Sequence, residues 1–107
     1  MNAEKYTQKT LDAVKTAQSM AQENGNQYLT PEHLLYALVD QDGGLIASLF
    51  GKMGVDCDGL LSELDTLIRR LPKVSGGSGE VYASPETGKI LNLAEKTAEK
   101  LHDDYIS

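Results

Sequence analysis

The sequence has little cysteine, few aromatic residues and no excess of positive charge. Its one cysteine, Cys57, cannot form an internal disulfide, and a lone reduced thiol is typical of a cytoplasmic protein, so we predict a cytoplasmic location. Five tyrosines, one phenylalanine and no tryptophan argue against an aromatic platform that stacks bases. Ten Lys and Arg stand against 16 Asp and Glu, a formal net charge of −6. Nucleic acid and anionic membrane surfaces are therefore unfavourable partners, because both require clustered cations.

Long hydrophobic runs and the common catalytic motifs are also missing. Residues 1–20 contain no apolar run of signal-peptide length, and no stretch approaches the roughly 20 residues of a membrane-spanning helix. The glycine cluster at 76–79 is followed by Glu80 and lacks the lysine of a phosphate-binding loop. His33 lies two residues after the proline that begins an expected helix, where we expect a packing or capping role, and His102 has no second His or Cys at ligand spacing. We therefore assign no catalytic residue, no metal site and no cofactor to this chain.

Apolar residues recur at steps of three and four, and no segment alternates for long, so the sequence predicts an all-α fold. The expected helices cover residues 7–24, 31–39, 45–53, 57–71 and 85–102. The second and fifth begin with the same cap, proline and acid arrangement, Thr30-Pro31-Glu32 and Ser84-Pro85-Glu86, and Asp56 is expected to cap the fourth. The expected buried faces contain Leu11, Val14, Ala17 and Ala21; Leu34, Leu35, Leu38 and Val39; Leu45, Leu49 and Phe50; Leu60, Leu64, Leu67, Ile68 and Leu71; and Leu91, Ala94, Ala98 and Leu101.

An offset of 77 residues aligns the start of the chain with its end. It pairs Thr10 with Thr87, Ala17 with Ala94, Ala21 with Ala98, and Tyr28 with Tyr105. The matches fall on the expected buried face and the caps, which predicts a tandem pseudo-repeat of a four-helix unit. Repeat one would cover residues 6–72, an inter-repeat linker 73–83, and the start of repeat two 84–107. Ser107 corresponds to the cap Thr30, so we expect a single domain over 1–107 whose second repeat is cut off after its first helix.

Several motifs resemble the Clp N-domain family, in particular the N-terminal domains of ClpB-type AAA+ protein disaggregases. They are "YLTPEHLLYALVDQDGG", the helix end and linker "RRLPKVSGGSGEV", and "ILNLAEKTAEKLHDDYIS". The resemblance covers essentially the whole chain from Tyr6. It implies a fold of two pseudo-symmetric four-helix repeats.

The resemblance also implies a function without catalysis. In this family the domain contacts unfolded or aggregated polypeptides and passes them to the AAA+ hexamer of the parent chain, whose ATP sites lie in downstream modules. The implied binding surface is an apolar groove near the junction of the repeats. Carried over by position, its residues here are Thr7 and Asp103 at polar positions and Leu91 at an apolar one. From the residues alone, Thr7 could be a helix cap, Leu91 a core residue and Asp103 a solvated loop acid.

Two other classes of function stay open at this point. The chain could be a helical domain that docks one folded adaptor protein, as the related ClpA and ClpC N-domains do. It could also be an enzyme that uses its acidic residues, which predicts a loss of turnover when Asp103 or Glu32 is replaced.

Overall fold

The computed structural model describes residues 3–74 and 79–106; of residues 3–7, 98–99 and 101–106 it describes only the helical backbone. The described chain forms five helices and two very short strands, which confirms the all-α prediction. The elements are α1 (Ala3–Glu23), β1 (Tyr28–Leu29), α2 (Pro31–Asp40), α3 (Leu45–Lys52), α4 (Cys57–Arg69), β2 (Tyr82–Ala83) and α5 (Pro85–Ile106).

Local capping sets the starts of the later helices as the sequence predicted. Thr30 precedes Pro31, the first residue of α2, and its backbone N–H donates to Nδ1 of His33 at 3.0 Å. The carboxylate of Asp56 accepts the backbone N–H of Gly59 at 3.1 Å at the start of α4. These bonds satisfy donors that the first turn of a helix otherwise leaves without a partner.

Two boundaries differ from the sequence prediction by four residues each, and the others lie within two residues of it. Helix α1 begins at Ala3, so Thr7 is its fifth residue and not its cap. Helix α5 continues to Ile106, beyond the expected end at His102, so Asp103 is a helical residue and not a loop acid. The 77-residue offset therefore aligns the short strand at Tyr28 with a helical segment, although the tandem repeat itself stays a prediction. Sequence signals for helix ends are weaker than those for helix interiors, because the last turns fray and depend on the packing around them.

The core lies where α1 packs against α2. It contains the buried residues Ala13, Ala17, Leu29, Leu34 and Ala37, with Val14, Leu38, Val81 and Leu91 partly buried against it. Small alanines on α1 allow the backbone of α2 to approach closely. Leu29 and Leu34, which flank the start of α2 as a hydrophobic staple, both join this core.

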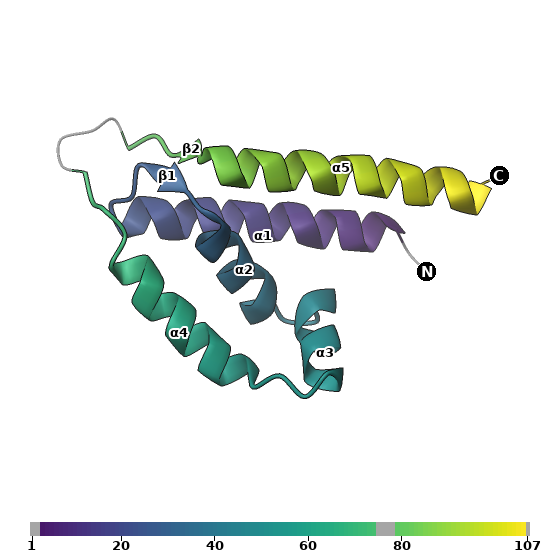
Figure 1. The fold of residues 1–107 in the computed structure, drawn as a ribbon, viewed down its shortest axis with the longest axis horizontal. Helices are drawn as coiled ribbons and strands as arrows, with labels where there is room; N and C mark the ends of the chain where they lie inside the picture. Colours follow the sequence, from purple (N-terminus) through teal and green to yellow (C-terminus); the bar gives the residue numbers. More distant parts are fainter. Residues whose placement is uncertain (1–2, 75–78, 107) are drawn as a thin grey trace.

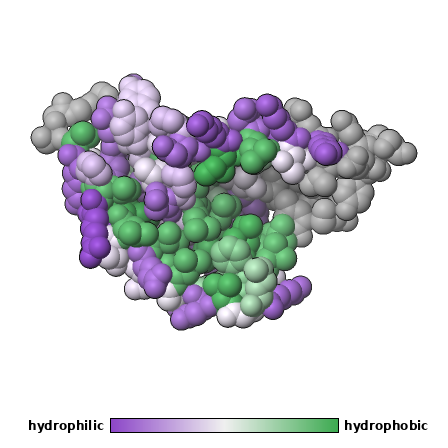
Figure 2. Space-filling view, in the orientation of Figure 1, coloured by the Kyte–Doolittle hydropathy of each residue, from purple (hydrophilic) through white to green (hydrophobic). Residues whose placement is uncertain are grey.

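Several residues expected in the core are exposed. Leu11 on α1 is 51% exposed and Leu67 on α4 is 49% exposed, and α3 buries none of its residues, since Leu45 and Leu49 also face outward. Figure 2 shows hydrophobic residues gathered across the middle of one face, in the area of α2, α3 and α4, with hydrophilic residues around it. The helical period correctly groups these leucines on one face of each helix. It does not reveal whether another element covers that face.

A two-stranded parallel sheet joins the segment before α2 to the segment before α5, and sequence analysis did not anticipate it. Tyr28 pairs with Tyr82 and Leu29 with Ala83. The pairing sets the segments "YLTPE" and "YASPE" side by side, so the N-termini of α2 and α5 lie next to each other. Part of the expected linker 73–83 is thus structured; its residues 75–78 lie outside the described residues.

The long helices α1 and α5 run antiparallel along the longest dimension of the molecule, and α2, α3 and α4 lie to one side of them (Figure 1). The start of α1 and the end of α5 consequently lie at the same end.

Candidate functional site

An apolar groove of about 360 Å³ lies where α1, α2 and α5 meet. Each helix contributes one face at a spacing of three or four residues, which is the spacing that brings side chains to one side of a helix. The lining residues are Thr10, Ala13 and Val14 from α1, Pro31, Leu34, Leu35 and Leu38 from α2, and Ile90, Leu91 and Ala94 from α5.

The two parallel strands determine where this groove forms. Because β1 and β2 hold the starts of α2 and α5 together, the first turns of both helices face the same side of α1. The bond from the Ser84 backbone N–H to the Leu29 carbonyl, 3.0 Å long, joins the strands at the point where α5 begins. Leu91 lies in the second turn of α5, close enough to that anchor to pack against the core.

The chemistry of the groove is almost entirely hydrophobic. Its lining contains no charged side chain, and Thr10 is its one polar residue. Ala13 and Leu34 form its buried base, whereas Ile90 is 46% exposed and Ala94 is exposed at its rim. A concave apolar surface without fixed charges favours burial of aliphatic or aromatic side chains and selects little between them.

The structure places one of the three predicted site residues in the groove. Leu91 is half-buried, so it is both a groove residue and a support of the core. Thr7 precedes Thr10 by about one turn of α1. Asp103 follows Leu91 by twelve residues of helix, about 18 Å along α5 at 1.5 Å per residue. The side chains of Thr7 and Asp103 lie outside the described residues. Since α1 and α5 are antiparallel, both backbones lie at the end of the helix pair beyond the groove.

Sequence analysis missed the contribution of α2, which supplies four of the lining residues. A signal was present: α2 carries Leu34, Leu35, Leu38 and Val39 in six positions, more apolar surface than one packed face requires. Where these additional apolar residues of α2 lie relative to α5 depends on the pairing of β1 with β2. The helical pattern of α2 does not encode that position.

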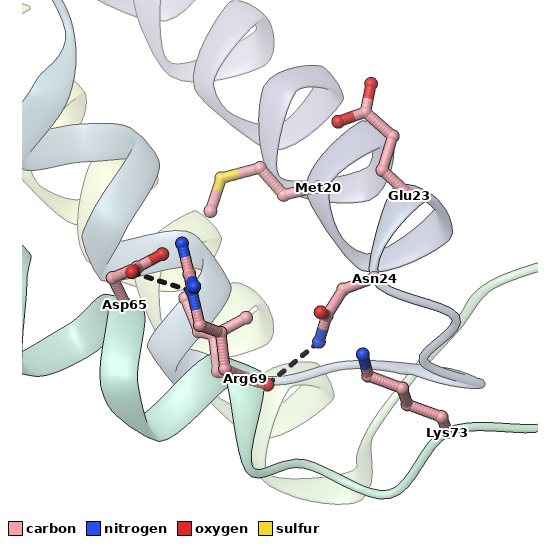
Figure 3. A pocket seen from close by; sticks show the side chains of 7 residues that line it. Met20, Glu23, Asn24, Asp65, Arg69 and Lys73 are labelled. Atoms are coloured by element: carbon pink, nitrogen blue, oxygen red, sulfur yellow. Dashed lines mark hydrogen bonds and ion pairs between the residues drawn. The ribbon is translucent and has the colours of Figure 1, made fainter.

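A second, polar cleft of about 450 Å³ lies between the end of α1 and α4 (Figure 3). It is lined by Met20, Glu23, Asn24, Asp65, Ile68, Arg69 and Lys73. Arg69 Nε lies 2.9 Å from the Asp65 carboxylate, so these opposite charges already pair across one turn of α4. The cleft is wide and open, which leaves it a weaker candidate than the groove for holding an apolar segment.

Other kinds of site find no support in the part of the chain that the structure describes. Among residues 3–74 and 79–106 no three or more His, Cys, Asp or Glu side chains form a group that could hold a metal ion. Among the same residues no helix is both long and apolar enough to cross a membrane.

Comparisons with a family model and with individual proteins agree on one family. The family model of the Clp repeat N-terminal domain matches residues 5–107. Chaperone protein ClpB of Brucella suis is 40% identical over 107 residues, and ClpB of Vibrio cholerae is 42% identical over the same length. Each alignment covers all of this chain but 12% of the relative, so the chain spans about an eighth of the length of these curated relatives. ClpB of Porphyromonas gingivalis is 40% identical with the same coverage.

A solved structure from "Preliminary structural investigations of a malarial protein secretion system" has the same fold. It superimposes with a TM-score of 0.71 at 26% sequence identity, and the match covers 86% of this chain and 63% of the other.

Proposed function

The chain belongs to the Clp repeat N-terminal domain family, and on that premise we propose that it is a polypeptide-binding accessory domain of a ClpB-type chaperone. The proposed clients are unfolded or aggregated polypeptides, which the domain would pass to the AAA+ hexamer of its parent chain. The role is non-catalytic, with ATP bound and hydrolysed in other modules, and the proposed location is the cytoplasm.

The apolar groove between α1, α2 and α5 carries this proposal. Unfolded chains share exposed apolar side chains and little else, so a surface that recognises many of them must rely on burial and not on specific hydrogen bonds. The groove offers ten lining residues without a charge and a volume suited to a few side chains. In this proposal Leu91 contacts the client in the groove, while Thr7 and Asp103 contribute polar contacts at the far end of the helix pair.

The test compares binding of a permanently unfolded polypeptide, reduced and carboxymethylated α-lactalbumin, with binding of native α-lactalbumin. We expect binding to the unfolded form alone, with a Kd on the order of micromolar or weaker. Leu91→Ser should weaken that binding by about tenfold or more, because one buried leucine contributes roughly 1.5–3 kcal/mol. Leu93→Ser is the matched control: Leu93 lies two residues along the same helix, is 66% exposed and does not line the groove.

Circular dichroism must first establish that each variant keeps its helices, since Leu91 also supports the core. Asp103→Asn and Thr7→Val then test the polar contacts without removing apolar area. Equal loss in the Leu91 and Leu93 variants would contradict the groove as the binding site. Binding of native and unfolded α-lactalbumin alike, or of neither, would contradict the client class and favour a domain that docks one folded adaptor.

A further inference from the structure

The imidazole of His33 is fully buried at the start of α2, and both of its nitrogens are paired. Nδ1 lies 3.0 Å from the backbone nitrogen of Thr30 and 2.9 Å from its hydroxyl oxygen. Nε2 lies 3.0 Å from Oδ1 of Asn26. A backbone N–H can only donate, so Nδ1 must be an unprotonated acceptor. The single ring proton is then on Nε2, which donates it to Asn26.

Two asparagines extend this contact to the end of α4. Asn26 Nδ2 donates to the backbone carbonyl of Pro72 at 3.1 Å. Asn24 Nδ2 donates both to Oδ1 of Asn26, at 3.0 Å, and to the carbonyl of Ile68, at 2.9 Å. Figure 3 shows Asn24 reaching from the end of α1 across to α4. The network thus joins the start of α2, the end of α1 and the end of α4, and the bonds of the His33 ring are the ones in it that depend on a titratable proton.

We propose that His33 is a proton-sensitive clasp: a second proton, on Nδ1, disrupts this network and releases the end of α4 from α1 and α2. A protonated Nδ1 would present a donor to the Thr30 N–H, another donor, so that bond would become a repulsive contact, and the new proton would have to turn to the Thr30 hydroxyl oxygen at 2.9 Å. The imidazolium would also be a buried cation, since Asn26 is neutral and itself buried. Protonation therefore costs the bond to the Thr30 N–H and buries a charge, which weakens the hold of the ring on Asn26 and, through Asn26, on Asn24.

The pKa of His33 agrees with a ring that is neutral in the folded chain. Burial lowers the pKa of His33 from its usual value of 6.5, and the neighbouring carboxylate of Glu32 acts in the opposite direction with a smaller effect. Because the pKa is lower in the folded chain, the unfolded chain binds more protons as the pH falls below about 6.5. The stability that neutral His33 contributes is complete above that pH and is lost as the pH decreases through the folded-state value. The charged group that acts on the ring is Glu32 of α2 itself. Glu23, Asp65, Arg69 and Lys73 line the polar cleft between the end of α1 and α4, and Glu86 lies in the first turn of α5.

Acidification would act on the groove as well, although the clasp does not depend on the proposed function. Pro31 and Leu34 line the groove from the first turns of α2, the same turns that the bond between Thr30 and His33 holds in place. In a domain whose His33 hydrogen bonds are broken, the α2 residues that line the groove would be held less firmly in place.

The test is the pH dependence of urea unfolding of the intact chain between pH 7.5 and 5.5. We expect the equilibrium constant for unfolding of the wild type to increase below pH 6.5 by up to about tenfold per pH unit, in addition to the change from other groups. His33→Gln should remove that component, because glutamine at this position can accept the Thr30 N–H and does not titrate. His102→Asn is the matched control, a change at the other histidine, and should keep the wild-type slope.

A second measurement, a ¹⁵N NMR titration of the wild-type imidazoles, needs no variant. It should show His33 with its proton on Nε2 at neutral pH and a pKa below 6.5, and amide protection near Ile68 and Pro72 should decrease together with its titration. Titration of His33 at or above 6.5, or an equal pH slope in wild type and His33→Gln, would overturn the clasp. If His33→Gln does not fold, the NMR titration decides alone. Loss of polypeptide binding at neutral pH in the Leu91 variant has no bearing on either result.

Discussion

The hydroxyl of Thr87 donates a 2.8 Å hydrogen bond to the backbone carbonyl of Leu29, which precedes it by 58 residues. The Ser84 hydroxyl in turn donates to Thr87 Oγ1 at 2.9 Å, and the Thr87 backbone N–H donates to Ser84 Oγ at 3.2 Å. The cap of α5 is thereby bonded to the strand that leads into α2. One local capping motif thus fixes the relative position of two walls of the groove.

Removing the Thr87 hydroxyl should destabilise the fold more than the loss of one small polar group on the surface would. Thr87→Val keeps the shape but removes the bond to Leu29 and leaves the buried Ser84 hydroxyl without its acceptor, so we expect a loss of about 1–3 kcal/mol in the free energy of unfolding. Urea unfolding monitored by circular dichroism measures the difference. Thr66→Val is the matched control, because the Thr66 hydroxyl bonds only within the exposed surface of α4, and it should change stability by less than about 0.5 kcal/mol. Equal effects of the two changes would show that the link between α5 and β1 does not stabilise the fold.

A charge placed in the groove should abolish most polypeptide binding while leaving the fold intact. Ala94 is exposed at the rim, so Ala94→Asp adds a carboxylate to an apolar surface without emptying a core position. A bound apolar side chain would have to desolvate that charge, and we expect binding of carboxymethylated α-lactalbumin to weaken by about tenfold or more. Asn92→Asp adds the same charge to the same helix outside the groove and should bind as the wild type does. Fluorescence anisotropy with a labelled polypeptide measures both. Comparable weakening by Asn92→Asp would mean that general repulsion by the acidic chain, and not the groove, sets the affinity.

Two neighbouring glycines should respond to alanine with opposite signs. Gly51 lies within α3 and Gly54 follows its end with φ of +81°, and an added Cβ meets no atom within 4 Å at either position. Gly51→Ala should stabilise the protein by about 0.5–1 kcal/mol, because alanine loses less backbone entropy in a helix. Gly54→Ala should destabilise it by about 1–2 kcal/mol, because a side chain disfavours the left-handed conformation. Thermal unfolding of the two variants gives the signs, and the same sign at both positions would contradict the end of α3 at this turn.

Much of the fold was predictable because its signals are local. Thr30, Asp56 and Ser84 were expected as caps, and a side chain that bonds to its own next turn needs no distant partner. The packing or capping role expected for His33 is confirmed for the same reason, since its Nδ1 accepts from Thr30 three residues earlier.

The exposed leucines show where local signals fail. Leu11, Leu49 and Leu67 have the spacing of buried residues, yet each lies on a face that no described element covers fully. Leu91 was expected at an apolar groove position from the family resemblance; in the structure it lines the groove between α1, α2 and α5, and its contact with a client stays a prediction. The α2 side of the groove was not expected at all.

The sequence by itself determined the presence of five helices, the caps of α2, α4 and α5, and the family, because helical period, capping and motif similarity are properties of neighbouring residues. The tertiary structure alone decided which apolar faces become core and which become surface. It did so through the pairing of Tyr28 with Tyr82, which brings α2 and α5 together across more than fifty residues. Such pairing depends on backbone hydrogen bonds that any residue except proline can make, so the side chains leave little trace of it in the sequence.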